Sequence, residues 1–198
     1  MADDALALLE LGSVARGLRA LDALVKKAPV TVLEANLVEP GHYLILFCGG
    51  VAEVEESLTE AMAVGDSQVR DHMFLPWAHP ALLRGLRGHE LRRDADELDC
   101  LGVLEGGGVA ATLRAADQTL KEAAVDLVGI RVAVGLGGRA WYVVSGAQHD
   151  VEAGLEAGQA ALDAAGATHA VERIARPHAE MVPWLLRTPP FSLSAQEP

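Results

Sequence analysis

The chain contains the same long segment twice, and this internal repeat constrains its architecture more than any other feature. The stretch ALALLELGSVARGLRALDALVKKAPV near the N-terminus returns, altered but in register, as CLGVLEGGGVAATLRAADQTLKEAAV. Asp22 and Lys26 of the first copy recur as Asp117 and Lys121 of the second. Two long copies predict two tandem domains, because a solenoid needs three or more short repeats to bury its core.

Length and composition fit two compact domains joined by a charged linker. The 198 residues are 51% hydrophobic, which is enough for two domains of about 90 residues each. We predict a first domain over residues 4–87, a linker over 88–97, a second domain over 98–187 and a disordered, proline-rich tail over 188–198.

The net charge and the lengths of the apolar runs limit the classes of partner and the cellular location that we expect. A chain with a net charge of −12 repels nucleic acid and anionic lipid, so we expect it to bind neither. The apolar run 43–48 is too short to span a bilayer, and the acidic N-terminus is unlike a signal peptide. These features predict a cytoplasmic protein.

Within each copy the hydrophobic patterns predict a β-α-β-β-α-β-α unit. In the first copy we expect strands over 5–11, 30–38, 43–50 and 72–78, and helices that begin at Val14, Val51 and Pro80. Gly65 can end the second helix, and the second copy follows the same order from residue 98 to 186. This is an α/β protein of the α+β, ferredoxin-like kind, with one extra helix in each unit.

An apolar stripe recurs on the first helix of both copies, and we expect it to face a sheet. The stripe consists of Val14, Leu18, Leu21, Val25 and Ala28, repeated as Val109, Leu113, Ala116, Leu120 and Ala123. Cys48 and Cys100 lie in apolar, strand-like runs without a CxxC partner, so we predict that both are buried free thiols.

The connections between the second and third strands carry distinctive turn residues. In the first copy the tip is Glu39-Pro40-Gly41-His42, and its Pro-Gly pair predicts a type II turn. In the second copy the tip is Gly135-Leu136-Gly137-Gly138 followed by Arg139, which lets the backbone approach another chain, a ligand or an axis closely. A phosphate loop is disfavoured, because a β-type run and not a helix follows these glycines.

The sequence contains no pattern typical of catalysis or metal binding. The seven histidines do not adopt HExxH or a similar spacing, and there is no GxSxG or cysteine nucleophile motif. His79 and His178 are repeat-equivalent, as are Glu10 and Glu105, which favours structural roles for all four. We therefore predict no catalytic residue, no resident cofactor and no metal site.

In order and twice over, these motifs resemble the tandem-domain, trimer-type shell proteins of bacterial microcompartments, over nearly all of residues 5–187. The segments GLRALDALVKKAPV and TLRAADQTLKEAAV are similar to the family's helix-and-edge segment, and IARPH is similar to its segment before the last helix. The segments EPGHYLILFCGG and AVGLGGRAWYVVSG resemble the pore hairpins of its propanediol-utilisation members.

The resemblance implies two BMC domains in unpermuted order and a flat homotrimer whose six similar units mimic a hexagon. Such tiles form polyhedral shells with hexamer-type and pentamer-type shell proteins, and metabolites cross a central pore. The implied pore lining is Glu39, Pro40, Gly41, His42, Gly135, Leu136, Gly137, Gly138 and Arg139. The implied tile-edge contacts are Lys26, Lys121 and Arg176.

Two departures from the family carry expectations of their own. Trp77 stands near where the second copy has Arg176, so alternate edges of the tile should differ chemically. Some relatives place a cysteine before the Pro-Gly of the first tip, and three copies hold an iron-sulfur cluster on the axis. Glu39 occupies that position here, so we expect a charged pore lining, with His42 close by, and no cluster.

Two other functions are compatible with the residues. Tandem ferredoxin-like units also form small-molecule sensors that bind ligands between subunits, although this chain has no spare domain to tether it to an enzyme or channel. A dimeric α+β barrel enzyme would place His79 or His178 in a cavity lined by polar groups.

Overall fold

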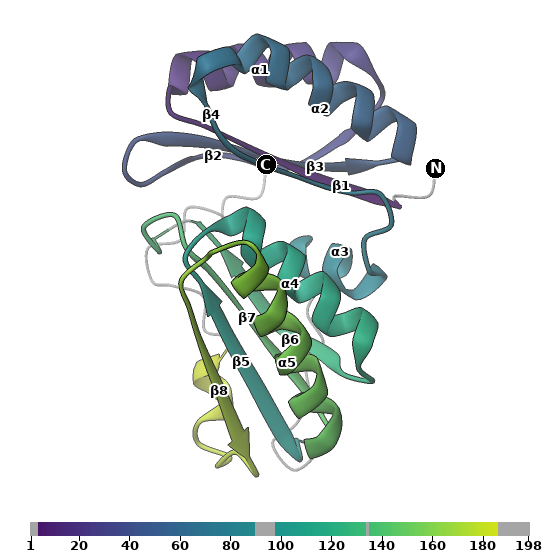
Figure 1. Ribbon diagram of the computed structural model, residues 1–198, viewed down its shortest axis with the longest axis vertical. Coiled ribbons are helices and arrows are strands. Elements are labelled where there is room, and N and C mark those ends of the chain that lie inside the picture. The colour runs from purple at the N-terminus through teal and green to yellow at the C-terminus, as the bar shows by residue number, and fades with distance from the viewer. Residues whose placement is uncertain (1–3, 90–97, 134, 186–198) are drawn as a thin grey trace.

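The computed structural model describes residues 4–89, 98–133 and 135–185, which form two similar units (Figure 1). Unit 1 comprises β1 (Ala5–Leu11), α1 (Val14–Lys27), β2 (Thr31–Val38), β3 (His42–Gly49), α2 (Val51–Gly65), the 3-10 turn η1 (Asp66–Gln68), β4 (Val69–Leu75) and α3 (Pro80–Leu86). Unit 2 comprises β5 (Cys100–Gly106), α4 (Val109–Glu122), β6 (Asp126–Val132), β7 (Ala140–Gly146), α5 (Gln148–Ala164), β8 (His169–Ala175) and α6 (Val182–Leu185). The predicted tail and most of the predicted linker lie outside the described residues.

Each unit contains one four-stranded antiparallel sheet, and the two sheets have the same topology. The strand orders are β2-β3-β1-β4 and β6-β7-β5-β8. The equivalent edge strands β2 and β6 carry a register shift at the same place, between Val32 and Glu34 in β2 and between Leu127 and Gly129 in β6. The repeat seen in the sequence is therefore also a repeat of structure, and the predicted element order is confirmed.

Local sequence explains where most elements begin and end. Helix α1 starts after Ser13, whose side chain accepts a hydrogen bond from the backbone N–H of Arg16 at 3.3 Å. Helix α2 ends at Gly65, as predicted, although the residue with positive φ is Asp66. The strand predicted over 72–78 is wrong in position: β4 spans Val69–Leu75, because η1 turns the chain directly after α2 and the strand starts earlier.

The core of unit 1 lies between the first sheet and the helices α1 and α2, which cover one face of it (Figure 1). Ile45 and Phe47 of the sheet and Leu24 of α1 are fully buried there. Gly17 allows α1 to lie close to β3, since a Cβ atom at this position would lie 2.5 Å from the ring of Tyr43.

Across the described residues, no helix is long and apolar enough to cross a membrane.

The prediction that the whole apolar stripe of the first helix faces a sheet is wrong for α1. Leu18 and Val25 of α1 are 52% and 47% exposed. Their equivalents in α4, Leu113 and Leu120, are buried, and they belong to an apolar cluster that unit 2 shares with unit 1. These positions therefore form a second apolar face of the helix, which is covered in α4 and exposed in α1.

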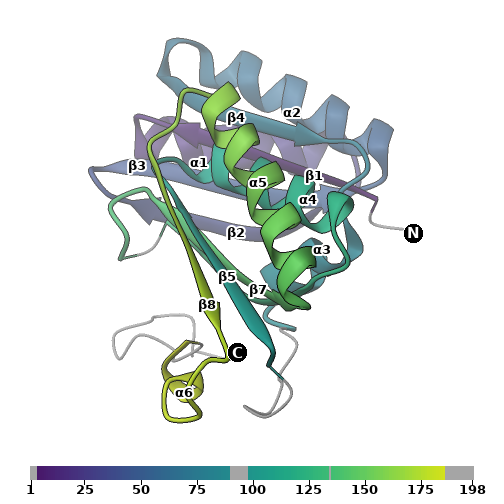
Figure 2. The same cartoon turned by 60° about the horizontal axis from the view of Figure 1, so that its bottom comes forward.

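The two units pack through the face of the first sheet that points away from α1 and α2. Leu8 and Met73 of that face join Leu82 of α3 and Leu113 of α4 in one continuous cluster. Cys48 and Cys100 are buried and form no disulfide, as predicted. The corresponding face of the second sheet packs against α6, seen in yellow in Figure 2, at the opposite end of the molecule from α1.

Candidate functional site

The two hairpin tips singled out in the sequence lie side by side (left in Figures 1 and 2). A Cβ atom at Gly138, in the tip between β6 and β7, would lie 3.2 Å from the carbonyl oxygen of Glu39, in the tip between β2 and β3. Gly138 also has a φ of 76°, a conformation that other residues rarely adopt. Glycine at this position therefore satisfies two requirements of the contact between the tips.

The first tip is a turn over Val38–Gly41. The backbone N–H of Gly41 donates to the carbonyl oxygen of Val38 at 3.0 Å, and the Glu39-Pro40 peptide bond is cis. The predicted type II turn is therefore wrong, because a cis proline at the third position is the arrangement of a type VI turn. Gly41 does have a positive φ, and Glu39 is exposed at the end of the hairpin.

The second tip contains two successive turns. The backbone N–H of Leu136 donates to the carbonyl oxygen of Ala133, and that of Arg139 donates to the carbonyl oxygen of Leu136, both at 3.2 Å. Gly135 and Gly137 have φ values of 70° and 60°, which a side chain would disfavour. The glycine-rich sequence is therefore explained by the backbone that this tip adopts.

A glutamate side chain pairs with a histidine or arginine side chain at the base of each tip. Glu10 lies 2.6 Å from Nδ1 of His42 in unit 1, and Glu105 lies 2.7 Å from a guanidinium nitrogen of Arg139 in unit 2. Structural roles were predicted for the two glutamates from the sequence, but these partners were not. The available signal was the repeat, since the glutamate near the end of the first strand recurs in both copies and a histidine or arginine ends the tip region in each.

Asp117 is the polar centre of the contact between the two units. Its carboxylate is 1% exposed and accepts hydrogen bonds from Nζ of Lys121 at 2.6 Å and from the backbone N–H of His79 at 2.8 Å. Burial lowers the pKa of the His79 imidazole, although the Asp117 carboxylate opposes this shift. The neutral imidazole can thus accept, through Nδ1, the backbone N–H of Ala81 at 3.3 Å.

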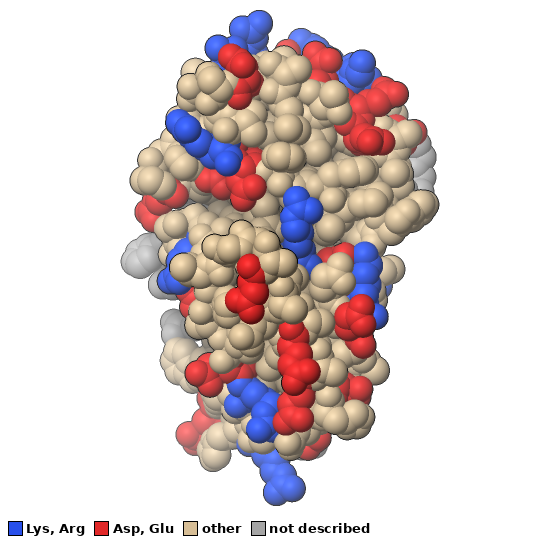
Figure 3. All heavy atoms as spheres, viewed as in Figure 1, with Lys and Arg blue, Asp and Glu red and all other residues tan. Residues whose placement is uncertain are grey.

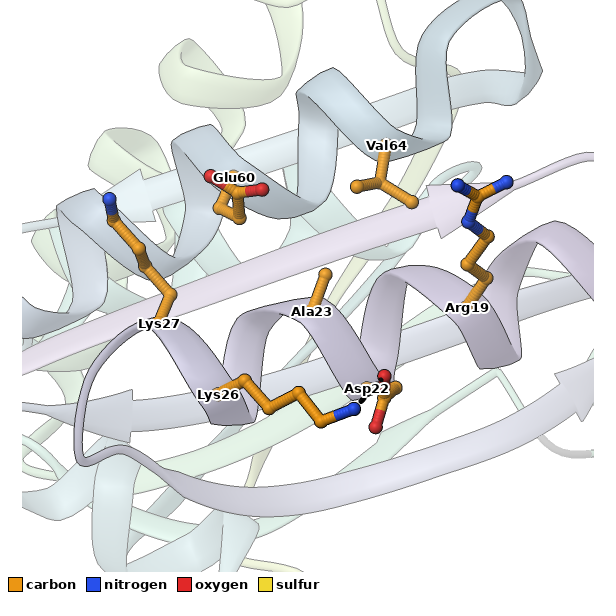
Figure 4. Close-up of a pocket in the computed structure, with 7 residues that line it drawn as sticks. All are labelled: Arg19, Asp22, Ala23, Lys26, Lys27, Glu60 and Val64. Carbon is orange, nitrogen blue, oxygen red and sulfur yellow. Dashed lines mark hydrogen bonds and ion pairs between the residues drawn. The ribbon is translucent and has the colours of Figure 1, made fainter.

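Unit 1 carries the same set of side chains without that cover. Asp22 and Lys26 pair at 2.6 Å, and their side chains are 59% and 72% exposed. They lie in a groove of about 440 Å³ between α1 and α2 (Figure 4). The groove is lined by Arg19, Asp22, Ala23, Lys26, Lys27, Glu60 and Val64.

Arg19 in this groove also has a repeat-equivalent that contacts the other unit. The equivalent is Arg114 of α4, whose guanidinium donates to the backbone carbonyl oxygen of His72 in β4 at 3.2 Å. The side chain of Arg19 projects from α1 at one end of the groove (Figure 4). The groove thus exposes, on α1, the counterparts of the α4 side chains that contact unit 1.

The predicted edge residues and their neighbours lie on the surface. The backbone N–H of Arg176, a residue with φ of 48°, donates to the carbonyl oxygen of Asp99 at 2.7 Å. Trp77, in the equivalent place in unit 1, is 66% exposed. His178 is exposed, and its Nδ1 accepts the backbone N–H of Glu180 at 3.3 Å, as His79 does for Ala81.

Acidic and basic side chains are interspersed over the face shown in Figure 3. Some of them pair across elements, such as Arg173 of β8 with Glu152 of α5 at 3.1 Å. Within residues 4–89, 98–133 and 135–185, no group of three or more His, Cys, Asp or Glu side chains is placed to hold a metal ion.

Comparisons with known proteins agree on one family. A family model described as the BMC domain matches this chain twice, over residues 5–78 and 100–177. The bacterial microcompartment shell protein PduT of Citrobacter freundii is 30% identical over 177 residues, which cover 89% of this chain and 95% of that protein. A crystal structure of a microcompartment protein from Desulfitobacterium hafniense DCB is 34% identical, with a TM-score of 0.82 over 91% of this chain and 98% of that one.

A more distant solved structure shows the fold alone. It is that of a fused permuted hexameric shell protein from the RMM microcompartment. It is 20% identical to this chain, with a TM-score of 0.54 over 83% of each chain.

Proposed function

This chain belongs to the BMC domain family, and from that premise we propose that it is a structural tile of a bacterial microcompartment shell, formed by three copies. The tile is a flat ring of six similar units with a central pore. Its role is structural and not catalytic, and its place in the cell is the microcompartment shell. One observation supports the ring above all. The two units of a chain pack through one interface, and the chain leaves exposed the two surfaces that could form an equivalent interface with another chain.

The exposed half on unit 1 is the outer face of α1. Leu113 and Leu120 of α4 are buried against unit 1, whereas the equivalent Leu18 and Val25 of α1 are about half exposed. Burying a leucine or valine side chain contributes about 1.5–3 kcal/mol. Leu18 and Val25 are exposed on a helix face that is buried in unit 2. They therefore favour a partner surface that resembles the outer face of the first sheet, which is the face that points away from α1 and α2.

The second sheet has such a surface at the end of the molecule opposite α1. Val103 and Trp141 lie on its outer face and line a hollow of about 490 Å³ that reaches the second hairpin tip. In the ring, α1 of one chain covers this face of the next. The backbone N–H of His178 then donates to Asp22, as that of His79 donates to Asp117 within the chain.

A contact of this head-to-tail kind forms either a closed ring or an open filament. The family supports closure, since six similar units around one axis make a hexagon. Closure by three chains places three copies of each hairpin tip near the axis, because the two tips of one chain already lie side by side. The tips of Glu39–His42 and Gly135–Arg139 would then alternate around the pore.

Glu39 gives the pore its charge in this arrangement. It is exposed at the tip of the first hairpin, whereas Glu10 and Glu105 are paired with His42 and Arg139 at the base of the tips. Three Glu39 carboxylates near one axis produce a negative field that favours cations over anions. The pore is therefore expected to prefer cations.

Changing Glu39 to Gln should reduce this preference and leave the trimer intact, because the amide keeps the size of the side chain and removes its charge. The measurement is the reversal potential of single pores under a salt gradient. Glu55→Gln removes an exposed carboxylate from α2 and serves as the control. An unchanged ion preference in Glu39→Gln would exclude Glu39 as the selective group and favour the glycine-rich tips.

Lys26, Lys121 and Arg176 form the proposed edges that meet other tiles, including hexamer-type and pentamer-type shell proteins. The side chains of Lys26 and Lys121 are 72% and 38% exposed, at the C-terminal ends of α1 and α4. A single exposed ion pair contributes only about 0–1 kcal/mol, but many identical edges act together in a sheet. Weak, repeated contacts also let assembly errors be corrected.

Replacing Lys26 and Lys121 by Ala together should suppress the growth of extended sheets at concentrations where light scattering still shows trimers. Every edge of the tile loses its amine, whereas Asp117 keeps the backbone N–H of His79 as a donor. Electron microscopy of the protein, alone and mixed with a hexamer-type shell protein, measures the effect. Lys27→Ala is the matched control, since Lys27 neighbours Lys26 but corresponds to Glu122 in the second copy. Normal sheets from the double variant would contradict the edge assignment.

A further inference from the structure

The two units differ at one position where they should make the same contact. The segment from His79 to Leu86 matches the segment from His178 to Leu185 residue by residue, and both histidines accept the backbone N–H two residues later. Leu86 and Leu185 are the same residue in this match, but Gly85 corresponds to Trp184. The smallest and the largest side chains thus occupy equivalent places on α3 and α6.

Gly85 is needed where α3 packs on unit 2. A Cβ atom at this position would lie 2.7 Å from Cδ2 of Leu127 and 3.3 Å from Cγ2 of Ile130, both on β6. Leu127 and Ile130 are themselves buried. The contact between the units of one chain therefore has no room for a side chain on α3 at this point.

The equivalent surface in unit 1 has smaller residues. The register of the two sheets matches Leu127 with Val32. Leu127 pairs with Val144 and Val32 pairs with Phe47, and each pair lies directly before the register shift of its strand. By the same register Ile130 corresponds to Ala35. Leu and Ile are thus replaced by Val and Ala on β2, where both side chains are partly exposed. This surface has the room that β6 lacks.

Trp184 is presented to fill that room. It is 66% exposed, while its neighbours Met181, Val182 and Leu185 pack on the outer face of the second sheet. We propose that Trp184 of one chain packs on Val32 and Ala35 of the next chain and is the main anchor of the contact between chains. The proposal rests on the ring described above, and its partner is a second copy of this chain.

The size exchange distinguishes the two kinds of contact in the ring. Glycine faces isoleucine and leucine within a chain, and tryptophan faces alanine and valine between chains. Tryptophan is among the residues that most often dominate an interface. Exchanging the pairings would place Trp against Leu127 and Ile130, where even a Cβ atom is crowded. The exchange therefore also selects the correct pairing of units.

The experiment compares Trp184→Ala with Trp77→Ala, because Trp77 is equally exposed and lies outside this contact. Mass photometry over a dilution series gives the concentration at which half of the trimers dissociate. Trp184→Ala should raise that concentration by at least about tenfold, and Trp77→Ala should leave it unchanged. Equal behaviour of both variants in a protein that is a trimer would overturn the anchor and leave the ring in place. A wild-type protein that never forms trimers would instead refute the ring.

A swap of the two side chains tests the size exchange directly. Trp184→Gly combined with Ala35→Ile reproduces, between chains, the pair that Gly85 and Ile130 form within a chain. The double variant should form tighter trimers than Trp184→Gly alone, and Ala35→Ile alone should form weaker ones than the wild type. A double variant no tighter than Trp184→Gly would overturn the proposed packing of Trp184 on Ala35.

Discussion

Changing Leu18 to Glu should convert the protein from a trimer into a folded monomer. Leu18 is 52% exposed within the chain, so a charged side chain there stays hydrated when the chain folds. In the ring the same side chain is buried against the next chain, where an unpaired carboxylate is strongly unfavourable. Each ring contains three such contacts, so the effect is expected to abolish assembly at micromolar concentration.

Leu113→Glu is the matched control for this variant. Leu113 occupies the equivalent place on α4 and is fully buried by the contact between the units of one chain. A charge there should prevent normal folding and not merely assembly. Light scattering and circular dichroism together separate the two outcomes. A trimeric Leu18→Glu variant would show that the exposed face of α1 is not an interface.

Replacing Asp117 by Ala should lower the free energy of unfolding by about 2–3 kcal/mol. The change removes two hydrogen bonds and leaves the partly buried backbone N–H of His79 without its acceptor. It also removes the partner of the Lys121 ammonium group. Denaturant unfolding of the monomeric Leu18→Glu variant, with and without the second substitution, measures the loss without a contribution from assembly.

Asp22→Ala in the same monomeric background provides the control for Asp117. Asp22 makes the equivalent pair with Lys26, but its side chain is 59% exposed, so its loss should change the free energy of unfolding by less than about 1 kcal/mol. In the wild-type background, Asp22→Ala should instead weaken the trimer. Equal losses from both substitutions in the monomer would contradict the different environments of the two carboxylates.

Much of the fold follows from the sequence because local and repeated signals coincide. The limits of β1 and the starts of α1 at Val14 and of α3 at Pro80 were all predicted. The repeat doubled the evidence for each element, since one copy supports the interpretation of the other. The hairpin tips were found in the same way, from turn residues between two apolar strands.

The errors have physical causes that a single sequence does not reveal. Leu18 and Leu24 are both apolar and lie on adjacent sides of α1, and helical spacing alone does not tell which of them faces the sheet. The segment Glu39-Pro40-Gly41 is compatible with either a trans or a cis peptide bond, and the structure has the cis form. The contrast between Gly85 and Trp184 gained meaning only when their surroundings in the two units were compared.

The residues of the candidate site could be predicted from the sequence, but the contacts between them could not. The sequence placed His42 and Arg139 at the tips, while their pairing with Glu10 and Glu105 needed the register of the strands. The lysines at the proposed edges were also identified, but the burial of Asp117 beside Lys121 depends on how unit 1 packs on unit 2. Contacts between units are long-range, and the pattern within one unit does not encode them.

In the proposed shell tile, three copies of this chain close into one ring of six units. The most direct test is the molar mass of the purified wild-type protein, measured by light scattering across a range of concentrations. A closed ring should give a single species of three times the chain mass of 20.8 kDa, with a mass that does not grow as the concentration rises. A stable monomer, or a mass that increases without limit as in an open filament, would contradict it.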